Sequence, residues 1–400
     1  MNSLRLDRSV LAFVIFVTLL AQILLYPGIA ELVEALGATT DLDASMWFLA
    51  AEFAAFICFV GVWGVASDRA SRRVPFIALG AALASACYLA MGIIGVLGGA
   101  SFASILGIRV LQGAGAVGAF SLALTMLMDL EGGHGRNMGA AGIAIGSGAA
   151  LGAPVGGALS GIDPVAPVFV AGGLFLVVPG LLALVTDRAP TETRASVRAV
   201  LGDLSARPAL SLPYAFGFID RLTAGTFSLV GVFYFRDHFG LSPGETGIML
   251  MLFFAPFALL QYPFGILSDR IGRFLPVVGG SICYGTLIVL VGQAPTVWVA
   301  GVIMLLVGVC GAIVSPATMA LVTDISPGTR RGTAMAGFNV AGSLGFLTGI
   351  VFGGLVAGAY GYPAAFAAVG ATEILIALAA IPWFVRFATR IGPSLGIERP

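Results

Sequence analysis

Six ionisable residues interrupt apolar runs that are long enough to cross a membrane, and these side chains could do chemistry there. They are Glu31, Glu52, Arg109, Asp220, Arg221 and Glu373. A charge at the centre of a membrane helix costs about 2.5 to 3.5 kcal/mol on insertion scales, so each is expected to face protein or water. Low-dielectric surroundings favour the neutral form of a carboxyl group, which can then load and release a proton. The expected chemistry is reversible proton binding.

Arg109 needs a partner acid, and the sequence offers Glu31, Glu34 and Glu52. Counting about 1.5 Å per residue from the outer helix ends places Glu31, Glu52 and Arg109 at similar depths, roughly 7 to 12 Å in. Glu34 is nearer the surface, where water solvates it. We expect Arg109 to hold a carboxylate, with Glu52 and Glu31 as alternatives. The pair could also be purely structural.

Asp220, Arg221 and Glu373 each lie about 15 Å from a helix end. Adjacent residues on a helix point about 100° apart, so Asp220 and Arg221 do not simply neutralise each other. Asp220 is the leading proton carrier. The alternative is a structural salt bridge to a neighbouring helix, and Glu373 is a further candidate carrier.

The composition is that of a membrane protein. Of 400 residues, 58% are hydrophobic and 10% charged, mean hydropathy is +1.02, and 56 glycines suit close helix packing. The first apolar run is too long for a signal-peptide core. The cysteines lie in apolar runs and are expected to be free, buried thiols; they are Cys58, Cys87, Cys283 and Cys310.

Runs of roughly 20 apolar residues predict an all-α integral membrane protein with twelve transmembrane helices. The predicted spans are 9–36, 45–67, 75–97, 102–129, 137–159, 165–186, 211–236, 244–267, 275–293, 296–324, 332–358 and 363–386. The polar stretch between the sixth and seventh spans is predicted to be a cytosolic linker, which could carry a short interfacial helix. The predicted domains are an N-terminal six-helix bundle (1–186), the linker (187–210) and a C-terminal six-helix bundle with a short cytosolic tail (211–400).

Arginine sets the predicted orientation, because the chain has no lysine. With both termini in the cytosol, seventeen arginines lie on the cytosolic side and only Arg236 lies outside. Arg109 and Arg221 fall within helices. Both termini are therefore expected to be cytosolic, and the expected location is a prokaryotic cytoplasmic (inner) membrane.

A charged turn occurs at the same place in each half of the chain. The stretch from Gly265 to Arg273 (GILSDRIGR) has a weaker copy from Gly64 to Arg72 (GVASDRASR), with Ser71 where the second copy has Gly272. Two repeated, pseudo-symmetric bundles suggest a transporter. The aspartates of the turn could face the N-terminus of a neighbouring helix, and its arginines keep the turn cytosolic. A turn that only sets topology is the alternative.

With these turns the chain resembles the major facilitator superfamily over essentially its whole length. The resemblance implies that Asp129 bonds Arg69 and that Asp324 bonds Arg270, forming latches that close the cytosolic side. The expected latch residues are Asp68, Arg69, Arg72, Asp129, Asp269, Arg270, Arg273, Asp324 and Arg331. Exposed ion pairs are worth about 0 to 1 kcal/mol each, so such latches bias a two-state equilibrium without driving it.

Two further motifs resemble those of the drug:proton antiporter branch. Arg109, Gln112 and Gly113 form an Arg-x-x-Gln-Gly motif, which the family associates with proton coupling. The fifth predicted helix carries a glycine-proline motif, and the eleventh repeats its four-residue glycine ridge. Such ridges suit a rocking interface between the two halves, with generic tight packing as the alternative; the residues are Gly148, Gly152, Pro154, Gly156, Gly345, Gly349 and Gly353.

Family geometry places the first, fourth, seventh and tenth helices around a central cavity. The expected cavity residues are Gln22, Tyr26, Gln112, Phe120, Phe216, Arg221 and Phe227. A largely apolar, aromatic lining suits a lipophilic or amphipathic compound better than a sugar or phosphate.

The sequence therefore predicts proton-coupled export of hydrophobic or amphipathic small molecules by alternating access. The alternatives are an uptake symporter or uniporter for a small metabolite, and a non-transporting receptor or lipid scramblase on the same bundle. We expect no enzymatic activity, cofactor, metal or nucleic-acid partner, because His134 and His238 are isolated and no nucleotide-binding loop occurs. The expected partners are the lipid bilayer, a small-molecule substrate and protons, and the expected state is a monomer.

Overall fold

The computed structural model describes residues 2–131, 134–187, 197–327 and 330–391, and all regular structure within these ranges is helical. The chain divides into two compact units. One comprises Met1–Arg194 with Gly240–Met251, and the other comprises Ala195–Phe239 with Leu252–Pro400. The predicted all-helical fold is confirmed.

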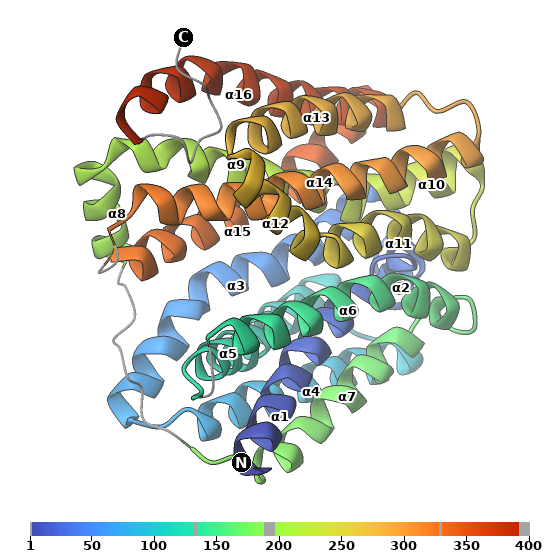
Figure 1. Cartoon of the computed structure of the whole chain (residues 1–400). Helices are drawn as coiled ribbons and strands as arrows, with labels where there is room; N and C mark the ends of the chain where they lie inside the picture. Colours follow the sequence, from blue (N-terminus) through green and yellow to red (C-terminus); the bar gives the residue numbers. More distant parts are fainter. Residues whose placement is uncertain (1, 132–133, 188–196, 328–329, 392–400) are drawn as a thin grey trace. The chain divides into compact units, whose positions relative to one another are not determined.

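The first unit is built from seven helices. They are α1 (Asn2–Ile23), α2 (Ile29–Ala35), α3 (Leu42–Ala70), α4 (Val74–Leu97), α5 (Phe102–Met128), α6 (His134–Ser160) and α7 (Ala166–Leu182). Helix α5 packs on α3 and α4, while α1 packs on α6 and α4 on α7 (Figure 1). The first span was predicted as one helix over 9–36, and this is wrong. The chain breaks after Ile23 because Pro27 lacks an N–H donor and restricts the residue before it.

The second unit begins with α8 (Val197–Ala206), a 3-10 turn η1 (Pro208–Leu210) and α9 (Ser211–Thr226). A π-helical turn η2 (Phe227–Gly231) joins α9 to α10 (Val232–Phe239). The remaining elements are α11 (Pro243–Leu259), which starts in the segment assigned to the first unit, α12 (Gln261–Ile271), the π-turn η3 (Leu275–Gly279), α13 (Gly280–Val291), α14 (Val297–Ile325), α15 (Arg331–Tyr360) and α16 (Tyr362–Ile391).

Nine helices in the described ranges are long and apolar enough to cross a membrane. A tenth span is the pair α11 and α12, bent by 49°. The bend has a physical cause: Pro263 cannot donate to the carbonyl of Leu259, so the helical ladder is interrupted there. Two shorter apolar helices, Ala166–Leu182 and Leu275–Val291, occupy the other two predicted spans. Each of the twelve predicted spans thus has a helical counterpart.

Helix α8 lies in the predicted linker and is tied to the second unit through Asp203. The buried Asp203 carboxylate accepts hydrogen bonds from Arg207 and, at 3.3 Å, from Nη1 of Arg330. Burial alone would raise the pKa of Asp203, but the hydrogen bonds from these two arginines outweigh it and hold the pKa below its usual value. The pair anchors the linker helix to the start of α15.

The repeated turn contains a residue with positive φ in both copies. Helix α3 ends at Ser71 with φ +51°, and α12 ends at Gly272 with φ +85°. Glycine adopts this region freely, whereas a residue with a Cβ is strained there. The two copies differ in ψ, which is 33° at Ser71 and 177° at Gly272, so the first copy has a turn geometry of its own.

Ser71→Gly is expected to stabilise the protein by about 0.5 to 1 kcal/mol. Relief of left-handed strain is worth about 1 to 2 kcal/mol, and the greater chain entropy of glycine in the unfolded state offsets part of it. Thermal unfolding in detergent measures the effect. Gly272→Ala, the matched change in the second copy, should lower the melting temperature. A lower melting temperature for Ser71→Gly would contradict this account of the turn.

Candidate functional site: a buried ion pair and the charged turns

Arg109 forms a buried ion pair with Glu52. Its Nη2 donates to Glu52 Oε2 at 2.6 Å, and its Nη1 donates to Gln112 Oε1 at 2.7 Å. Gln112 Nε2 in turn donates to Glu52 Oε1 at 3.3 Å. The exposed fraction is 0% for the Arg109 side chain and 1% for Glu52. The three side chains thus form a closed polar triad inside the first unit.

The Arg-x-x-Gln-Gly spacing explains how one helix supplies most of this triad. Positions three and four apart share a helix face, so Arg109, Gln112 and Gly113 of α5 all face α3. A Cβ at Gly113 would lie 2.8 Å from the carbonyl oxygen of Glu52, which is closer than real Cβ atoms come. Glycine at this position therefore lets α3 approach closely enough for the two polar side chains to reach Glu52.

Aromatic rings complete the environment of Arg109. The guanidinium carbon lies 4.4 Å from the centroid of Phe48 and 5.8 Å from that of Tyr88. Phe48 precedes Glu52 by four residues on α3, so the helix presents both to α5. Sequence analysis missed both rings. The four-residue spacing could have indicated Phe48, whereas Tyr88 comes from α4 and has no local signal.

The structure selects Glu52 from the candidate partners of Arg109. Glu31 lies on the short helix α2 and is partly exposed, and Glu34 is exposed. Gln22 lies beside Glu52, and Tyr26 lies within electrostatic range of Arg109. Because burial desolvates both charges, removing one member of such a pair is far more costly than replacing both.

Asp220 and Arg221 point in different directions from α9, as adjacent helical positions must. Asp220 is 4% exposed and lies beside Ser315 of α14, whereas Arg221 is exposed. The stem of Arg221 passes close to Gly342 of α15. Glu373 of α16 is fully buried in the same unit. Both acidic candidates of the second half are therefore interior residues.

Two of the expected cavity residues, Phe216 and Phe227, belong to the interior of their own unit. Phe216 is fully buried in an apolar core with Val277 and Leu321, because its face of α9 is turned to neighbouring helices. Phe227 packs between Phe253 and Phe366. Their place in a substrate cavity stays a prediction.

Gln112, also expected in the cavity, is fully buried and forms hydrogen bonds with Arg109 and Glu52. Gln22 and Tyr26 are 7% and 1% exposed, while Phe120 is partly exposed. Their place in a substrate cavity stays a prediction.

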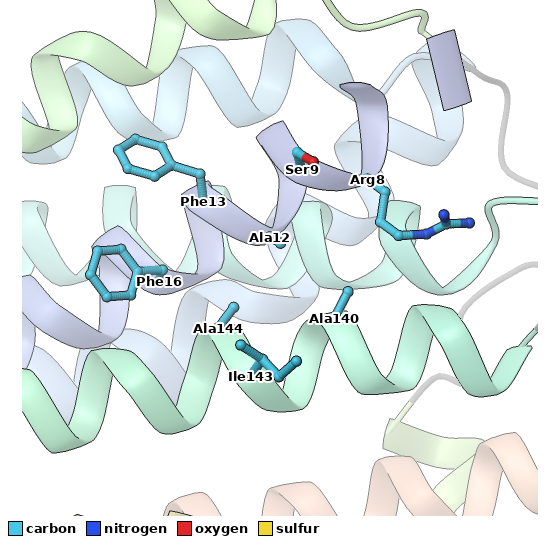
Figure 2. A pocket seen from close by; sticks show the side chains of 8 residues that line it. All are labelled: Arg8, Ser9, Ala12, Phe13, Phe16, Ala140, Ile143 and Ala144. Atoms are coloured by element: carbon cyan, nitrogen blue, oxygen red, sulfur yellow. The ribbon is translucent and has the colours of Figure 1, made fainter. Parts of the chain in front are cut away.

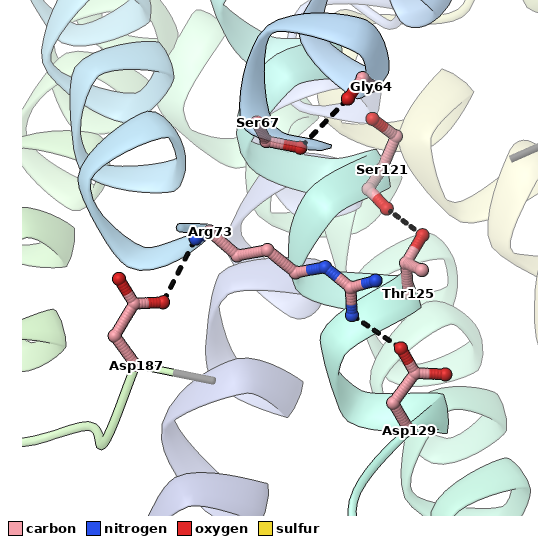
Figure 3. A network of polar contacts seen from close by, with 7 residues as sticks. All are labelled: Gly64, Ser67, Arg73, Ser121, Thr125, Asp129 and Asp187. Atoms are coloured by element: carbon pink, nitrogen blue, oxygen red, sulfur yellow. Dashed lines mark hydrogen bonds and ion pairs between the residues drawn. The ribbon is translucent and has the colours of Figure 1, made fainter. Parts of the chain in front are cut away.

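The first charged turn is held by Arg73, not by Arg69 (Figure 3). Nη1 of Arg73 lies 2.5 Å from Asp129 Oδ2, and its backbone N–H donates to Asp187 Oδ1 at 2.9 Å. Arg73 is 2% exposed, whereas Arg69 lies on the exposed face of the last turn of α3. The expected pairing of Asp129 with Arg69 is therefore wrong. The left-handed residue Ser71 redirects the chain so that the later arginine points inward.

Asp187 has a second role at this turn, since it also accepts from the N–H of Val74 at 3.1 Å. It thus caps the N-terminus of α4, which we expected of Asp68. Oδ1 of Asp68 is buried without a hydrogen-bond partner among the described residues. An acid just after the sixth apolar run was the available signal for Asp187, and sequence analysis missed it.

The second charged turn follows the same rule. Nε of Arg273 donates to Asp324 Oδ2 at 3.0 Å, and its Nη1 lies 2.7 Å from Asp269 Oδ1. Arg270 is exposed, so its expected pairing with Asp324 is wrong. Asp269 is 66% exposed, so its ion pair with Arg273 contributes little to stability. Arg72 and Arg331 are exposed.

Arg73→Gln is expected to reduce stability by about 1 to 3 kcal/mol, the usual worth of hydrogen bonds to charged groups. It should also reduce transport, because Asp129 loses its partner in the turn. Arg69→Gln is the matched control and should change stability by less than about 0.5 kcal/mol. Thermal unfolding and transport by the two variants are compared. Equal effects of the two substitutions would contradict the conclusion that Arg73, and not Arg69, holds the first charged turn.

The glycine ridges pack helices within each unit. Gly148, Gly152 and Gly156 of α6 lie against α1, and a Cβ at Gly148 would lie 2.9 Å from the carbonyl oxygen of Phe16. The helix continues through Pro154. The ridge of α15 lies against α9, where Gly345 faces the carbonyl of Phe218; its other members are Gly349 and Gly353.

The contacts of these ridges show tight packing inside each unit, and their role at a rocking interface between the halves stays a prediction. The absence of a Cβ allows the backbones of α1 and α6, and of α9 and α15, to touch.

A groove of about 370 Å³ lies on the first unit between α1 and α6 (Figure 2). Its lining is mainly apolar, with Phe13 and Phe16 from α1 and Ile143 from α6. Arg8 stands in the lining, where its Nε donates to Asn137 Oδ1 at 2.9 Å. The groove is thus lined by two aromatic rings and carries one cation.

The fold and these motifs define a class of membrane transporter. The family model of the Major Facilitator Superfamily matches residues 11–234 and, again, residues 214–399. The chain therefore belongs to this superfamily, and its long apolar helices are those of an integral membrane protein.

Several known proteins are similar to parts of the chain. Multidrug resistance protein MdtG of Yersinia enterocolitica is 29% identical over 171 residues, which cover 41% of this chain and 40% of that protein. An uncharacterized MFS-type transporter of Methanocaldococcus jannaschii is 34% identical over 139 residues, covering 34% of this chain and 36% of that protein. The similarity thus spans two fifths or less of these curated relatives.

Solved structures show the same fold along the whole chain. A D-xylose-proton symporter superposes with a TM-score of 0.75 at 16% identity, covering 98% of this chain and 99% of that one. A bacterial homolog of the human lysosomal transporter Spinster gives 0.75 at 16% identity, with 97% of each chain covered. At this identity the likeness concerns the fold alone.

Proposed function

We propose that the protein exports hydrophobic or amphipathic small organic molecules in exchange for protons, by alternating access. The observation that carries the proposal is the buried triad of Glu52, Arg109 and Gln112. Burying two charges is costly, and the triad occupies the motif that the drug:proton antiporter branch associates with coupling. The similarity to MdtG, a multidrug resistance protein, supports export as the direction.

In this proposal Arg109 sets the proton affinity of the first unit. Its guanidinium favours the charged form of Glu52, and a proton reaches Glu52 when that contact loosens. Gln112 bonds both partners and so keeps them aligned. Asp220 carries a proton in the second unit, where Ser315 can stabilise its carboxylate. Glu31 stays a candidate for a further exchanging group.

The proposed substrate class follows from the apolar lining of the groove between α1 and α6. The groove of Phe13, Phe16 and Ile143 is apolar and carries few polar groups, which favours a lipophilic or amphipathic compound over a sugar. Tyr26, Gln22, Phe120 and Arg221 are the remaining cavity candidates.

The other features are assigned accordingly. The charged turns with Arg73 and Arg273 act as latches that bias one conformation, within the predicted bundles 1–186 and 211–400. Both termini lie in the cytosol, the membrane is a prokaryotic inner membrane, and the protein acts as a monomer. The alternatives are an uptake symporter or uniporter and a non-transporting receptor or scramblase.

Accumulation of ethidium in bacterial cells tests the direction of transport. Cells that express the protein should accumulate less dye than cells with the Arg109→Ala variant, and a protonophore should abolish the difference. Greater accumulation on expression would indicate uptake. If a panel of lipophilic dyes, amines and anions is distributed equally in both cell types, export of this class is ruled out.

A further inference from the structure

A second group of buried polar side chains lies within the second unit. Asp220 of α9, Tyr284 of α13 and Glu373 of α16 are 4%, 0% and 0% exposed. Helix α13 packs on α14 and α16, and α9 also packs on both. Tyr284 lies within electrostatic range of both acids, and the two acids lie within range of each other. Four helices thus converge on two carboxyl groups and a phenol.

Glu373 is held inside this group by close helix packing. A Cβ at Gly285 of α13 would lie 2.6 Å from the carbonyl oxygen of Gly370 and 3.1 Å from Cβ of Glu373. The stem of Glu373 therefore starts against α13, beside Tyr284. Neither carboxyl oxygen of Glu373 has a hydrogen-bond partner of ordinary geometry among the described residues, although the Ser281 hydroxyl lies beside it.

The charges around the group do not balance two carboxylates. The ionisable groups within electrostatic range of its members are Arg221 of α9 and Cys310 of α14, besides Asp220, Tyr284 and Glu373 themselves. Helix α15 carries its ionisable residues, Arg331 and Tyr360, only at its ends. Arg221 is the one cation near the centre of this set, and it is exposed and acts on Asp220.

An isolated carboxylate in such surroundings becomes neutral by binding a proton, since the charged form would pay the full desolvation cost. A protonated carboxyl group is one donor with remaining acceptor capacity, which matches neighbouring hydroxyl groups. Asp220 differs from Glu373 because Arg221 and Ser315 favour its charged form.

We propose that Glu373 holds a stored proton permanently in the folded protein, while Asp220 is the member of this pair that exchanges its proton, and Tyr284 lies within range of both. The two acids then form one proton site whose charge is carried by Asp220 only. The exchange at Asp220 rests on the proposed proton coupling, whereas the stored proton on Glu373 does not. Glu373 is accordingly a positioning residue for Asp220 and not a second carrier.

Infrared spectroscopy of the purified protein in detergent tests this assignment without any transport assay. The C=O stretching band of a protonated carboxyl group should be present at neutral pH, and its pH-independent part should disappear in Glu373→Gln. Asp220→Asn should keep that band and lose only the part that changes with pH. Tyr284→Phe should shift the frequency of the carboxyl C=O band that we assign to Glu373. This variant tests the assignment even if Glu373→Gln folds poorly.

Three results would overturn the proposal. The band could be missing from the wild-type protein, it could be unchanged in Glu373→Gln, or it could appear only when sodium is removed, which would mean that a metal ion neutralises the acids. If Glu373 holds a stored proton but the protein moves no protons, the assignment of Glu373 is supported and the proposed proton-coupled transport is refuted. Proton-coupled transport without the band would do the reverse.

Discussion

Arg109→Ala is expected to abolish proton-driven transport and to lower stability by about 3 to 5 kcal/mol, the cost of leaving a buried charge without its partner. Glu52 would remain buried at 1% exposure, with only Gln112 as a partner at 3.3 Å. Glu52→Gln should be similarly damaging, because it leaves the guanidinium uncompensated. Transport in proteoliposomes and thermal unfolding in detergent measure the two losses separately.

A double variant separates coupling from stability. In Glu52→Gln with Arg109→Gln both charges are gone, so much of the lost stability should return, since replacing a whole buried pair is often neutral. Transport should stay absent, because the first unit has lost the carboxyl group to which we assign proton exchange there, although Asp220 is still present. A double variant that is both stable and fully active would show that the pair is only a packing element.

Asp220→Asn is the second change with a large expected effect. The amide resembles the protonated acid and cannot titrate, so uphill export should stop while substrate binding persists and loses its pH dependence. Because Asp220 is 4% exposed and lies beside Ser315, a neutral side chain of the same shape should fit without loss of the fold. Binding of a lipophilic dye across a pH series measures the effect.

Arg221→Gln provides the matched control on the neighbouring residue. Arg221 is exposed, so its removal should leave the fold intact. The pH midpoint of substrate-linked proton release should rise, because a positive charge that favours the Asp220 carboxylate is gone. Wild-type proton release from Asp220→Asn would place the carrier elsewhere, with Glu52 and Glu31 next in order.

The membrane fold could be predicted because apolar side chains favour lipid and charged side chains are costly there, so long apolar runs in the sequence indicate the spans. The same argument required a partner for Arg109 and restricted the choice to acids at its depth, of which Glu52 is the one observed. Its aromatic neighbours depend on how α4 packs against α5, and a single sequence does not encode that contact locally. Tyr88 is the clearest case.

The sequence does not determine the site where a small change in backbone geometry redirects a side chain. In the charged turn, one left-handed residue decides whether Arg69 or Arg73 points inward. On α9, rotation of the helix decides whether Phe216 meets a cavity or a core, and apolar residues suit both. The glycine ridges show a close helix contact but do not name the partner helix, which proved to be in the same unit.

Proton movement on substrate addition tests the central claim most directly. The protein is reconstituted into proteoliposomes that contain a pH-sensitive reporter dye. A drug or a second dye that shifts the melting temperature of the protein is added as substrate, and no ion gradient is imposed. The account predicts proton flux opposite to substrate flux in the wild-type protein, and none with Arg109→Ala or Asp220→Asn. Substrate movement without proton movement, or proton flux in the same direction as the substrate, would contradict it.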